Sequence, residues 1–299
     1  MTAATPTPTP SPTMLVLTPS YRPDHALCVE LNRSVLRLAP PAVRHALVVP
    51  PADLGLFRSL AGERTTVQDA RAVVPRPLRK IPGLNLWLDP RAPFPPVRGW
   101  VAQQVVKLAA AAAADDDLVL LADSDLVFVR PFGPRTFAPD GAVPLYRREG
   151  AVSAHLPRHV RWHEVARRLL GLPPGDEPAR PDYVCWPCLW EPAVVRRMLA
   201  RVEAVTGLPW AAAVGHELHV SEMVLYGVYV DEVEGRDRAV PHTDDMRCPA
   251  YSDEAPLDRD GLAAFLARVR LRDVAVMVSA KSGTALDLRR ALIAARVPG

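Results

Sequence analysis

The sequence predicts a single α/β domain built on a mostly parallel sheet. Short apolar runs that indicate buried strands alternate with longer segments whose apolar residues recur at helical spacing. Hydrophobic residues make up 49% of the 299 residues, which is enough to bury a large core. No linker or change in composition follows residue 13, so we expect one domain over residues 14–299.

The first elements are predicted from the change of composition after the N-terminal residues. Residues 1–13 are dominated by Thr and Pro, which favour solvated, extended backbone, and we predict a disordered tail there. From Met14, MLVLT is a short run rich in strand-forming residues. A loop then precedes HALCVELNRSVLRL, in which Leu31 and Val35 belong to an apolar stripe at helical spacing. The order is therefore strand, loop, helix.

The same alternation continues along the chain. Residues 46–50 predict a second buried strand and residues 53–60 a short helix, while TTVQDA and RAVVP are interpreted as edge material. GWVAQQVVKLAAAAAA predicts a strong helix, which the acidic residues 115–117 end before the strand LVLLA. Farther on, we predict helices in VRWHEVARRLLG, EPAVVRRMLARVEAVTG and LAAFLARVR, a helix or helix-to-strand segment in SEMVLYGVYVDEV, and a late strand in VAVMVSA.

Charge and cysteine content exclude several classes of protein. The net charge of +3 comes from scattered Arg without interleaved aromatic residues, which argues against a nucleic-acid partner and suits a small anionic ligand. Four cysteines are too few for a disulfide-stapled secreted fold. We find no signal peptide and no apolar run of 18 residues or more, so we expect a cytoplasmic protein without a transmembrane segment. The oligomeric state stays open.

Asp123 and Asp125 follow the predicted strand LVLLA directly. Open α/β sheets bind ligands outside the carboxyl ends of their strands. An extended backbone would point both carboxylates to the same side, where they could share Mn²⁺ or Mg²⁺ with phosphate oxygens. The alternative is a solvated Asp-Ser-Asp turn, which the apolar runs on both sides make less favourable.

The strand ending in DSD and followed by VFVRPF resembles the DxD metal-binding motif of GT-A glycosyltransferases. The order GWVAQQVVKL, LLADSDLVFVRPF, SEMVLYGVYV is similar to a bacterial family of uncharacterised glycosyltransferase-like proteins, in patches over residues 14–290. The resemblance implies a GT-A fold and sugar transfer from a nucleotide-diphosphate sugar to a small-molecule or glycan acceptor. It also implies Mn²⁺ or Mg²⁺ as cofactor.

The resemblance further implies a donor site. The loop after the first strand would hold the nucleotide, with Tyr21 stacking on a base and Asp24 accepting from a ribose or base donor. Lys107, which shares a helix face with Gln103, would reach the diphosphate or sugar. The alternatives are a loop aromatic and a solvated helix face. The expected donor contacts are Thr18, Ser20, Tyr21, Asp24, Gln103, Gln104, Lys107, Asp123 and Ser124.

Two further residues are candidates for the reaction. Glu222 is expected to act as a general base or a donor-sugar ligand, and the alternative is a carboxylate in the first turn of a helix capped by Ser221. If Glu222 is not the base, Asp231 or Asp244 is the next candidate. His242 is expected as a further metal ligand beside Asp123 and Asp125, and the alternative is an ordinary loop histidine.

The motif Cys185-Trp-Pro-Cys188 could be a redox pair or half of a zinc site. The sequence supplies neither a second CxxC nor a nearby His pair. We therefore expect buried thiols in a loop on the acceptor side, where Trp186 and Trp190 could pack or stack on a sugar.

Two other functions compete with sugar transfer. Asp123, Asp125 and Val127 match the D-x-D-x-[TV] motif of haloacid-dehalogenase phosphatases, in which Asp123 would be the nucleophile. The acidic pair Asp244 and Asp245 precedes VMVSAK, however, which is the wrong order for that class. The third candidate is a noncatalytic module that binds a nucleotide or sugar.

Overall fold

The computed structural model describes residues 12–75, 78–81, 84, 86–139, 141–175, 179–236 and 239–295. Its centre is a five-stranded sheet in the order β12-β7-β1-β2-β3. Four neighbouring strands are parallel and the edge strand β12 is antiparallel to β7. These strands are β1 (Met14–Pro19), β2 (Arg44–Val49), β3 (Thr65–Asp69), β7 (Leu118–Leu121) and β12 (Cys188–Trp190). The predicted α/β class with a mostly parallel sheet is confirmed.

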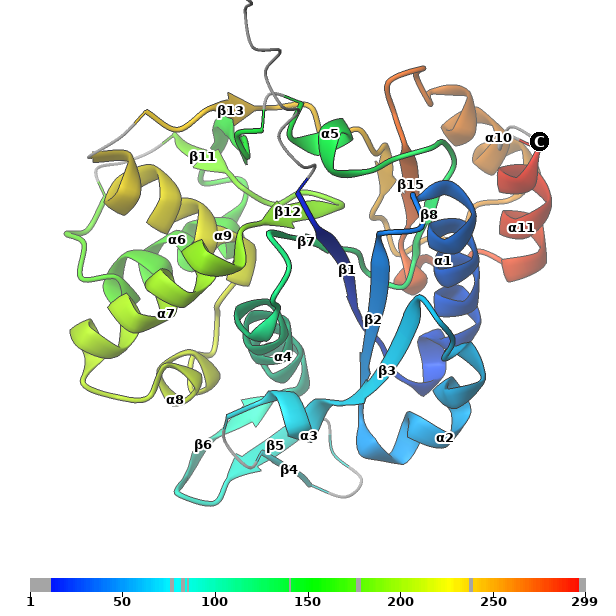
Figure 1. The fold of residues 1–299 in the computed structure, drawn as a ribbon. Coiled ribbons are helices and arrows are strands. Elements are labelled where there is room, and N and C mark those ends of the chain that lie inside the picture. The colour runs from blue at the N-terminus through cyan, green and yellow to red at the C-terminus, as the bar shows by residue number, and fades with distance from the viewer. Residues whose placement is uncertain are drawn as a thin grey trace, which may run out of the picture.

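Helices cover both faces of this sheet (Figure 1). Side chains alternate along each strand, so Val16 and Leu120 pack on one face, against α1 (His25–Leu38). Leu17 and Leu121 pack on the opposite face, in the larger core. The helices of that second face are α4 (Gly99–Ala113), α6 (Pro157–Leu169), α7 (Pro192–Thr206) and α9 (Glu222–Val228). Both faces of the parallel strands are therefore buried, as their continuous apolar runs predict.

Smaller elements surround this core. The short sheets are β4-β5-β6 (Arg79–Lys80, Leu86–Asp89, Ala92–Arg98), β10-β11 (Arg148–Val152, Arg180–Asp182), β13-β9 (His242–Thr243, Leu145–Tyr146) and β14-β15-β8 (Ala250–Tyr251, Ala275–Val278, Leu126–Phe128). The remaining α-helices are α2 (Leu54–Phe57), α3 (Ala70–Val73), α5 (Pro134–Phe137), α8 (Trp210–Gly215), α10 (Arg259–Ala267) and α11 (Leu286–Ala294).

Three local predictions can be compared with the structure. The predicted late strand in VAVMVSA is confirmed as β15, which pairs antiparallel with β8 in a separate sheet. For SEMVLYGVYVDEV we predicted a helix or a helix-to-strand segment, and the helix is present, since α9 continues directly into a π-helical turn, Tyr229–Val233. Val228, Tyr229 and Val230 are buried in the core there, and this packing outweighs their preference for strands. RAVVP begins as the helical turn α3 rather than as edge strand.

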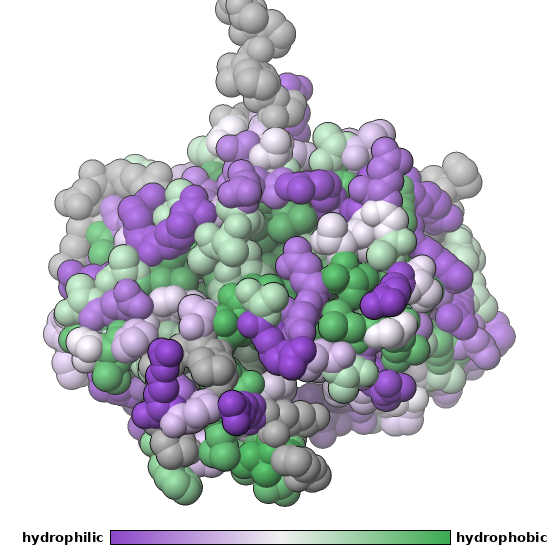
Figure 2. All heavy atoms as spheres, turned by 60° about the horizontal axis from the view of Figure 1, so that its bottom comes forward, coloured by the Kyte–Doolittle hydropathy of each residue, from purple (hydrophilic) through white to green (hydrophobic). Residues whose placement is uncertain are grey.

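The N-terminal residues and the surface add two observations. Residues 1–11 of the predicted tail lie outside the described residues, whereas the Thr13 amide donates to Asp117 Oδ2 at 2.8 Å. Within the described part of the chain, no helix has the length and apolarity needed to cross a bilayer. Apolar side chains reach the surface around the β4-β5-β6 sheet, where Phe94 is 81% exposed, and Figure 2 brings this end of the molecule forward.

A buried hydrogen-bond network joins the first three strands to α1. His45 on β2 is fully buried and contacts Thr18 Oγ1 at 2.9 Å and Asn32 Oδ1 at 2.8 Å. The Thr65 hydroxyl donates to the same Asn32 oxygen at 2.9 Å. Because an amide oxygen only accepts, His45 carries its proton on Nδ1, and its Nε2 accepts from Thr18. Burial lowers the pKa of His45 to about 3.

This network predicts how stability depends on pH. The unfolded chain protonates His45 below about pH 6.5, whereas the folded protein keeps it neutral down to about 3. Acid in this range therefore favours the unfolded state. We expect the free energy of unfolding of the wild type to fall with decreasing pH more steeply than that of His45→Gln. The difference in slope approaches about 1.4 kcal/mol per pH unit.

Urea unfolding at several values between pH 7 and pH 4 measures the two slopes. His155→Gln removes an exposed histidine and is the matched control, which should keep the slope of the wild type. Equal slopes for the wild type and His45→Gln would contradict the assignment of a neutral, buried His45.

Candidate functional site

The segment Asp123–Asp125 forms a turn between two sheets. β7 ends at Leu121, β8 begins at Leu126, and the Leu126 amide donates to the Asp123 carbonyl at 3.1 Å to close the turn. The extended backbone that we predicted for this segment is therefore wrong, and the turn is only partly open to solvent. Ser124 is buried, and its hydroxyl donates to Ser20 Oγ at 2.8 Å, which ties the turn to the loop after β1.

Asp125 is held by the C-terminal part of the chain. Its Oδ2 accepts from the Ala280 amide at 2.8 Å, and its carbonyl oxygen accepts from Arg289 Nη2 at 3.0 Å. Sequence reasoning missed both partners. A backbone amide carries no side-chain signature, and one arginine among many gives no signal.

Lys107 lies between two carboxylates. Its Nζ is 2.9 Å from Asp123 Oδ1 and 3.1 Å from Glu222 Oε1. The side chains of Lys107 and Glu222 are each only 7% exposed, and that of Asp123 is 31% exposed. Burial alone would lower the pKa of Lys107, but the charges of Asp123 and Glu222 and their hydrogen bonds outweigh it and raise the pKa above its usual value. The ammonium therefore stays charged.

The start of α9 fixes the position of Glu222. Ser221 caps the helix, because its side chain accepts from the Val224 amide at 3.3 Å. The Glu222 amide donates to Gln104 Oε1 at 2.9 Å, so Gln104 on α4 supports the backbone of this residue. The structure thus confirms the predicted cap and also places the Glu222 carboxylate against Lys107.

Asp24 faces the same turn from the loop after β1. Burial raises the pKa of Asp24 to about 6, with further contributions from the charges of Asp125 and Asp123, while Arg289 opposes them. Burial and then the charge of Asp123 likewise raise the pKa of Asp125. We call the following set of residues the acidic cluster: Asp24, Lys107, Asp123, Asp125, Glu222 and Arg289. With every group ionised, its four carboxylates and two cations have a net charge of −2.

Some of the other predicted donor contacts have side chains that a ligand could reach, and others already bond to the protein. Tyr21 is 46% exposed beside Asp24, whose charge, after burial, raises the pKa of the Tyr21 hydroxyl. Gln103 is half-buried on α4. Thr18 is fully buried and its hydroxyl bonds to His45, so its side chain is not presented to a ligand. We therefore leave the Thr18 side chain out of the proposed donor site.

The structure does not bring His242 to the acidic cluster. His242 Nε2 is 3.5 Å from Asp231 Oδ1, and Asp231 Oδ2 accepts from the Tyr183 hydroxyl at 2.7 Å and from Arg147 Nε at 2.8 Å. Among the residues that the structure describes, no three or more His, Cys, Asp or Glu side chains form a group that could hold a metal ion by themselves. A cation at Asp123 and Asp125 would need additional oxygen ligands from a substrate or water.

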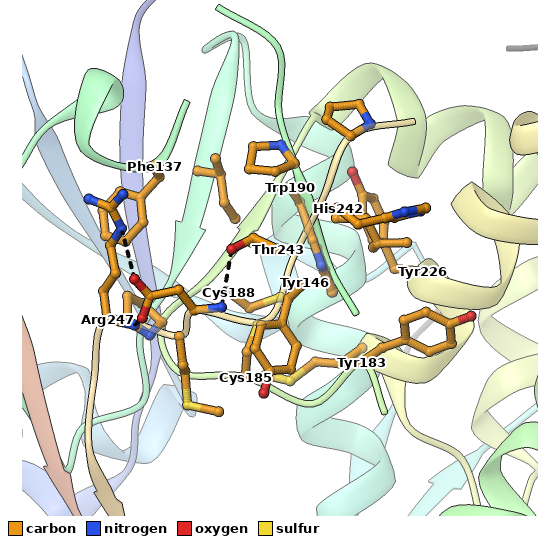
Figure 3. A pocket seen from close by; sticks show the side chains of 18 of the residues that line it. Phe137, Tyr146, Tyr183, Cys185, Cys188, Trp190, Tyr226, His242, Thr243 and Arg247 are labelled. Carbon is orange, nitrogen blue, oxygen red and sulfur yellow. Dashed lines mark hydrogen bonds and ion pairs between the residues drawn. The ribbon is translucent and has the colours of Figure 1, made fainter. Parts of the chain in front are cut away.

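A pocket of about 310 Å³, which we call the aromatic pocket, is lined in part by residues of β12 and α9 (Figure 3). Cys188 lines it and pairs with Leu121 of β7, two residues before Asp123. Met223 lines it and directly follows Glu222. Tyrosines and buried sulfur atoms form much of the wall, including Tyr146, Tyr183, Tyr226 and Cys185. The pocket and the acidic cluster therefore have α9 in common, and the pocket's strand β12 is the neighbour of β7 in the sheet.

The CxxC cysteines are buried thiols, as predicted. A hydrogen bond with Cys188 and burial raise the pKa of Cys185 well above its usual value, which disfavours the reactive thiolate. Trp190 is fully buried and stacks on Tyr226 with ring centroids 5.1 Å apart. Of the two roles that we considered for Trp190, the structure shows packing.

These features define an α/β protein with an acidic cluster at the carboxyl edge of a parallel sheet. The chain belongs to the family described as "Family of unknown function (DUF6492)", whose model matches residues 17–257. A comparison with curated proteins gives no match. Among solved structures, the chain is similar to the crystal structure of mouse xyloside xylosyltransferase 1 in its apo form, with 14% sequence identity and a TM-score of 0.44. The similarity covers 88% of this chain and 96% of that chain.

Proposed function

We propose that the protein is a divalent-cation-dependent glycosyltransferase that uses a nucleotide-diphosphate sugar. The observation that carries this proposal is the acidic cluster, which lies at the carboxyl end of β7 and is tied to the loop after β1 by Ser20 and Ser124. Parallel sheets bind ligands at this edge. The DSD sequence and its context, which resemble the GT-A metal-binding motif, support the same assignment.

The charge of the acidic cluster supports a role for a divalent cation. A net charge of −2 would repel a diphosphate, whereas Mn²⁺ or Mg²⁺ takes oxygen ligands from carboxylates and phosphates together. Asp123 and Asp125 would hold the cation, and its fit rests on their hard oxygen donors and on the excess of carboxylates around them. When bound, the cation supplies Lewis-acid stabilisation of the charge on the departing diphosphate.

The protein's own residues would position the donor and the cation ligands. Tyr21 is exposed at the loop after β1 and can stack on a base. Lys107 contacts Asp123 and Glu222, so we assign it the positioning of these carboxylates rather than direct binding of the phosphates. The hydrogen bond from Ala280 to Asp125 holds the second aspartate of the motif.

The aromatic pocket is our candidate for the acceptor site. It shares α9 with Glu222, through the adjacent Met223. Glu222 is therefore the carboxylate that we propose as the general base for an acceptor hydroxyl. In that role it would have to exchange its contact with Lys107 for one with the acceptor.

Turnover of nucleotide sugars tests the proposed function. The purified protein would be incubated with Mn²⁺ and nucleotide-diphosphate sugars carrying each common base, and the released species would be separated by chromatography. We expect release of a nucleoside diphosphate from at least one donor, accelerated by a hydroxyl acceptor and stopped by EDTA. Release of inorganic phosphate, with a covalent aspartyl-phosphate at Asp123, would instead identify the phosphatase. Tight binding of a nucleotide without any cleavage would identify a binding module.

A further inference from the structure

A second pocket, of about 330 Å³, lies between α1, β8 and α11. We call it the α1–α11 pocket. Apolar side chains form much of its lining, among them Leu27, Phe128 and Ile293, of which Phe128 and Ile293 are buried. α1 and α11 lie side by side at the edge of the molecule in Figure 1. The aromatic pocket and the α1–α11 pocket have no lining residue in common.

The charged residues of the α1–α11 pocket are mainly arginines. Four arginines and one glutamate line it, so its net charge is +3. Glu30 contacts Arg33 at 3.1 Å and Arg290 at 3.0 Å, and Asp287 contacts Arg290 at 3.4 Å. Within the described part of the chain, no carboxylate forms an ion pair with Arg37, which lies four residues after Arg33 on the same face of α1. Positive charge therefore remains after the internal ion pairs are formed.

Arg289 connects this pocket to the DSD turn. It is buried, with 4% of its surface exposed, and its Nη2 donates to the Asp125 carbonyl oxygen at 3.0 Å. A guanidinium carries five N–H donors in a planar fork, so one bond to Asp125 leaves donors for a second partner. Because Arg289 also lines the α1–α11 pocket, an anion bound there can contact the side chain that supports Asp125.

We propose that the α1–α11 pocket binds a small organic anion, namely a phosphate or carboxylate attached to an aromatic or short aliphatic group. Its volume lies within the range of small-molecule sites. Arginine forks match the geometry of both oxyanions, and the apolar side chains accept the rest of the ligand. This proposal does not depend on sugar transfer, because none of its evidence comes from the donor site except the contact between Arg289 and Asp125.

Calorimetric titration with phenyl phosphate tests the proposal, with EDTA present so that the acidic cluster holds no divalent cation. The wild type should show saturable binding of one equivalent. Inorganic phosphate lacks the apolar group and benzyl alcohol lacks the charge, so both should bind at least about tenfold more weakly. Benzoate in place of phenyl phosphate distinguishes a carboxylate site from a phosphate site.

Arg37→Gln locates the binding. Arg37 is exposed and forms no ion pair among the described residues, so the variant should keep the melting temperature of the wild type while binding phenyl phosphate about tenfold more weakly. Arg158→Gln, which removes an exposed arginine on α6, is the matched control and should bind as the wild type does. The proposal is overturned if the wild type shows no saturable binding, or if Arg37→Gln binds as tightly as Arg158→Gln.

Discussion

Replacing Lys107 with methionine is expected to lower the free energy of unfolding by about 3–5 kcal/mol. Methionine approximates the aliphatic part of the lysine but carries no charge. The variant would leave Glu222, 7% exposed, without its cation, and Asp123, 31% exposed, with less compensation. Removing one partner of a buried ion pair is costly because the other charge stays buried and unpaired. Because solvent screens the partly exposed Asp123, we expect the loss of unfolding free energy to lie toward the lower end of this range.

A second substitution separates this effect from general damage to the core. In Lys107→Met/Glu222→Gln the unpaired buried carboxylate is gone, so the double variant should recover more than half of the lost stability. Urea unfolding at pH 7 measures the cycle. Lys281→Met, at an exposed position, is the control and should change the free energy of unfolding by less than about 0.5 kcal/mol. A loss of less than about 1 kcal/mol for Lys107→Met would show that solvent already screens the three charges.

The helices and central strands could be predicted because their signal is local. The apolar stripe of HALCVELNRSVLRL coincides with α1, and GWVAQQVVKLAAAAA coincides with α4. The apolar run LVLL coincides with β7. A helix or buried strand repeats one pattern over many residues, so periodicity reveals it.

The turn at DSD could not be predicted from the same pattern. Asp-Ser-Asp favours turns, but its apolar neighbours led us to prefer an extended backbone at the end of the strand LVLLA. They belong to different sheets, because β8 pairs with β15, about 150 residues later in the chain. Such long-range pairing leaves no trace in the local sequence. The same reason explains why Ala280 and Arg289, which hold Asp125, were missed.

The resemblance to GT-A glycosyltransferases predicted site residues that the apolar periodicity could not predict. It pointed to Asp24 and Lys107 as donor contacts, and the structure places both beside the DSD turn. Glu222, which we expected from its own chemistry, contacts Lys107 there. The resemblance gave no guide to loops. His242 lies on β13 and contacts Asp231 because that short strand pairs with β9, away from the acidic cluster.

Asp125→Asn is expected to weaken the Mn²⁺-dependent binding of a nucleoside diphosphate by about 100-fold or more. Loss of a residue that only supports a metal ligand commonly costs 10- to 100-fold, and here the charge of a proposed ligand itself is removed. The amide keeps the size of the carboxylate, and its oxygen can still accept from the Ala280 amide. The charge of Asp125 is also unfavourable in the folded protein, because burial and then the negative charge of Asp123 raise the pKa of its carboxyl group. The fold should therefore remain stable.

The most direct test of the central claim is a calorimetric titration of the wild type and Asp125→Asn with each common nucleoside diphosphate, with Mn²⁺ and with EDTA. Asp260→Asn serves as the matched control, because Asp260 is exposed at the start of α10 and lines neither pocket. We expect one nucleotide to bind the wild type and Asp260→Asn tightly with Mn²⁺, weakly with EDTA, and weakly to Asp125→Asn under both conditions. If Asp125→Asn binds with Mn²⁺ as tightly as the wild type, or if EDTA leaves binding to the wild type unchanged, the DSD turn is not the site of a cation that holds the donor.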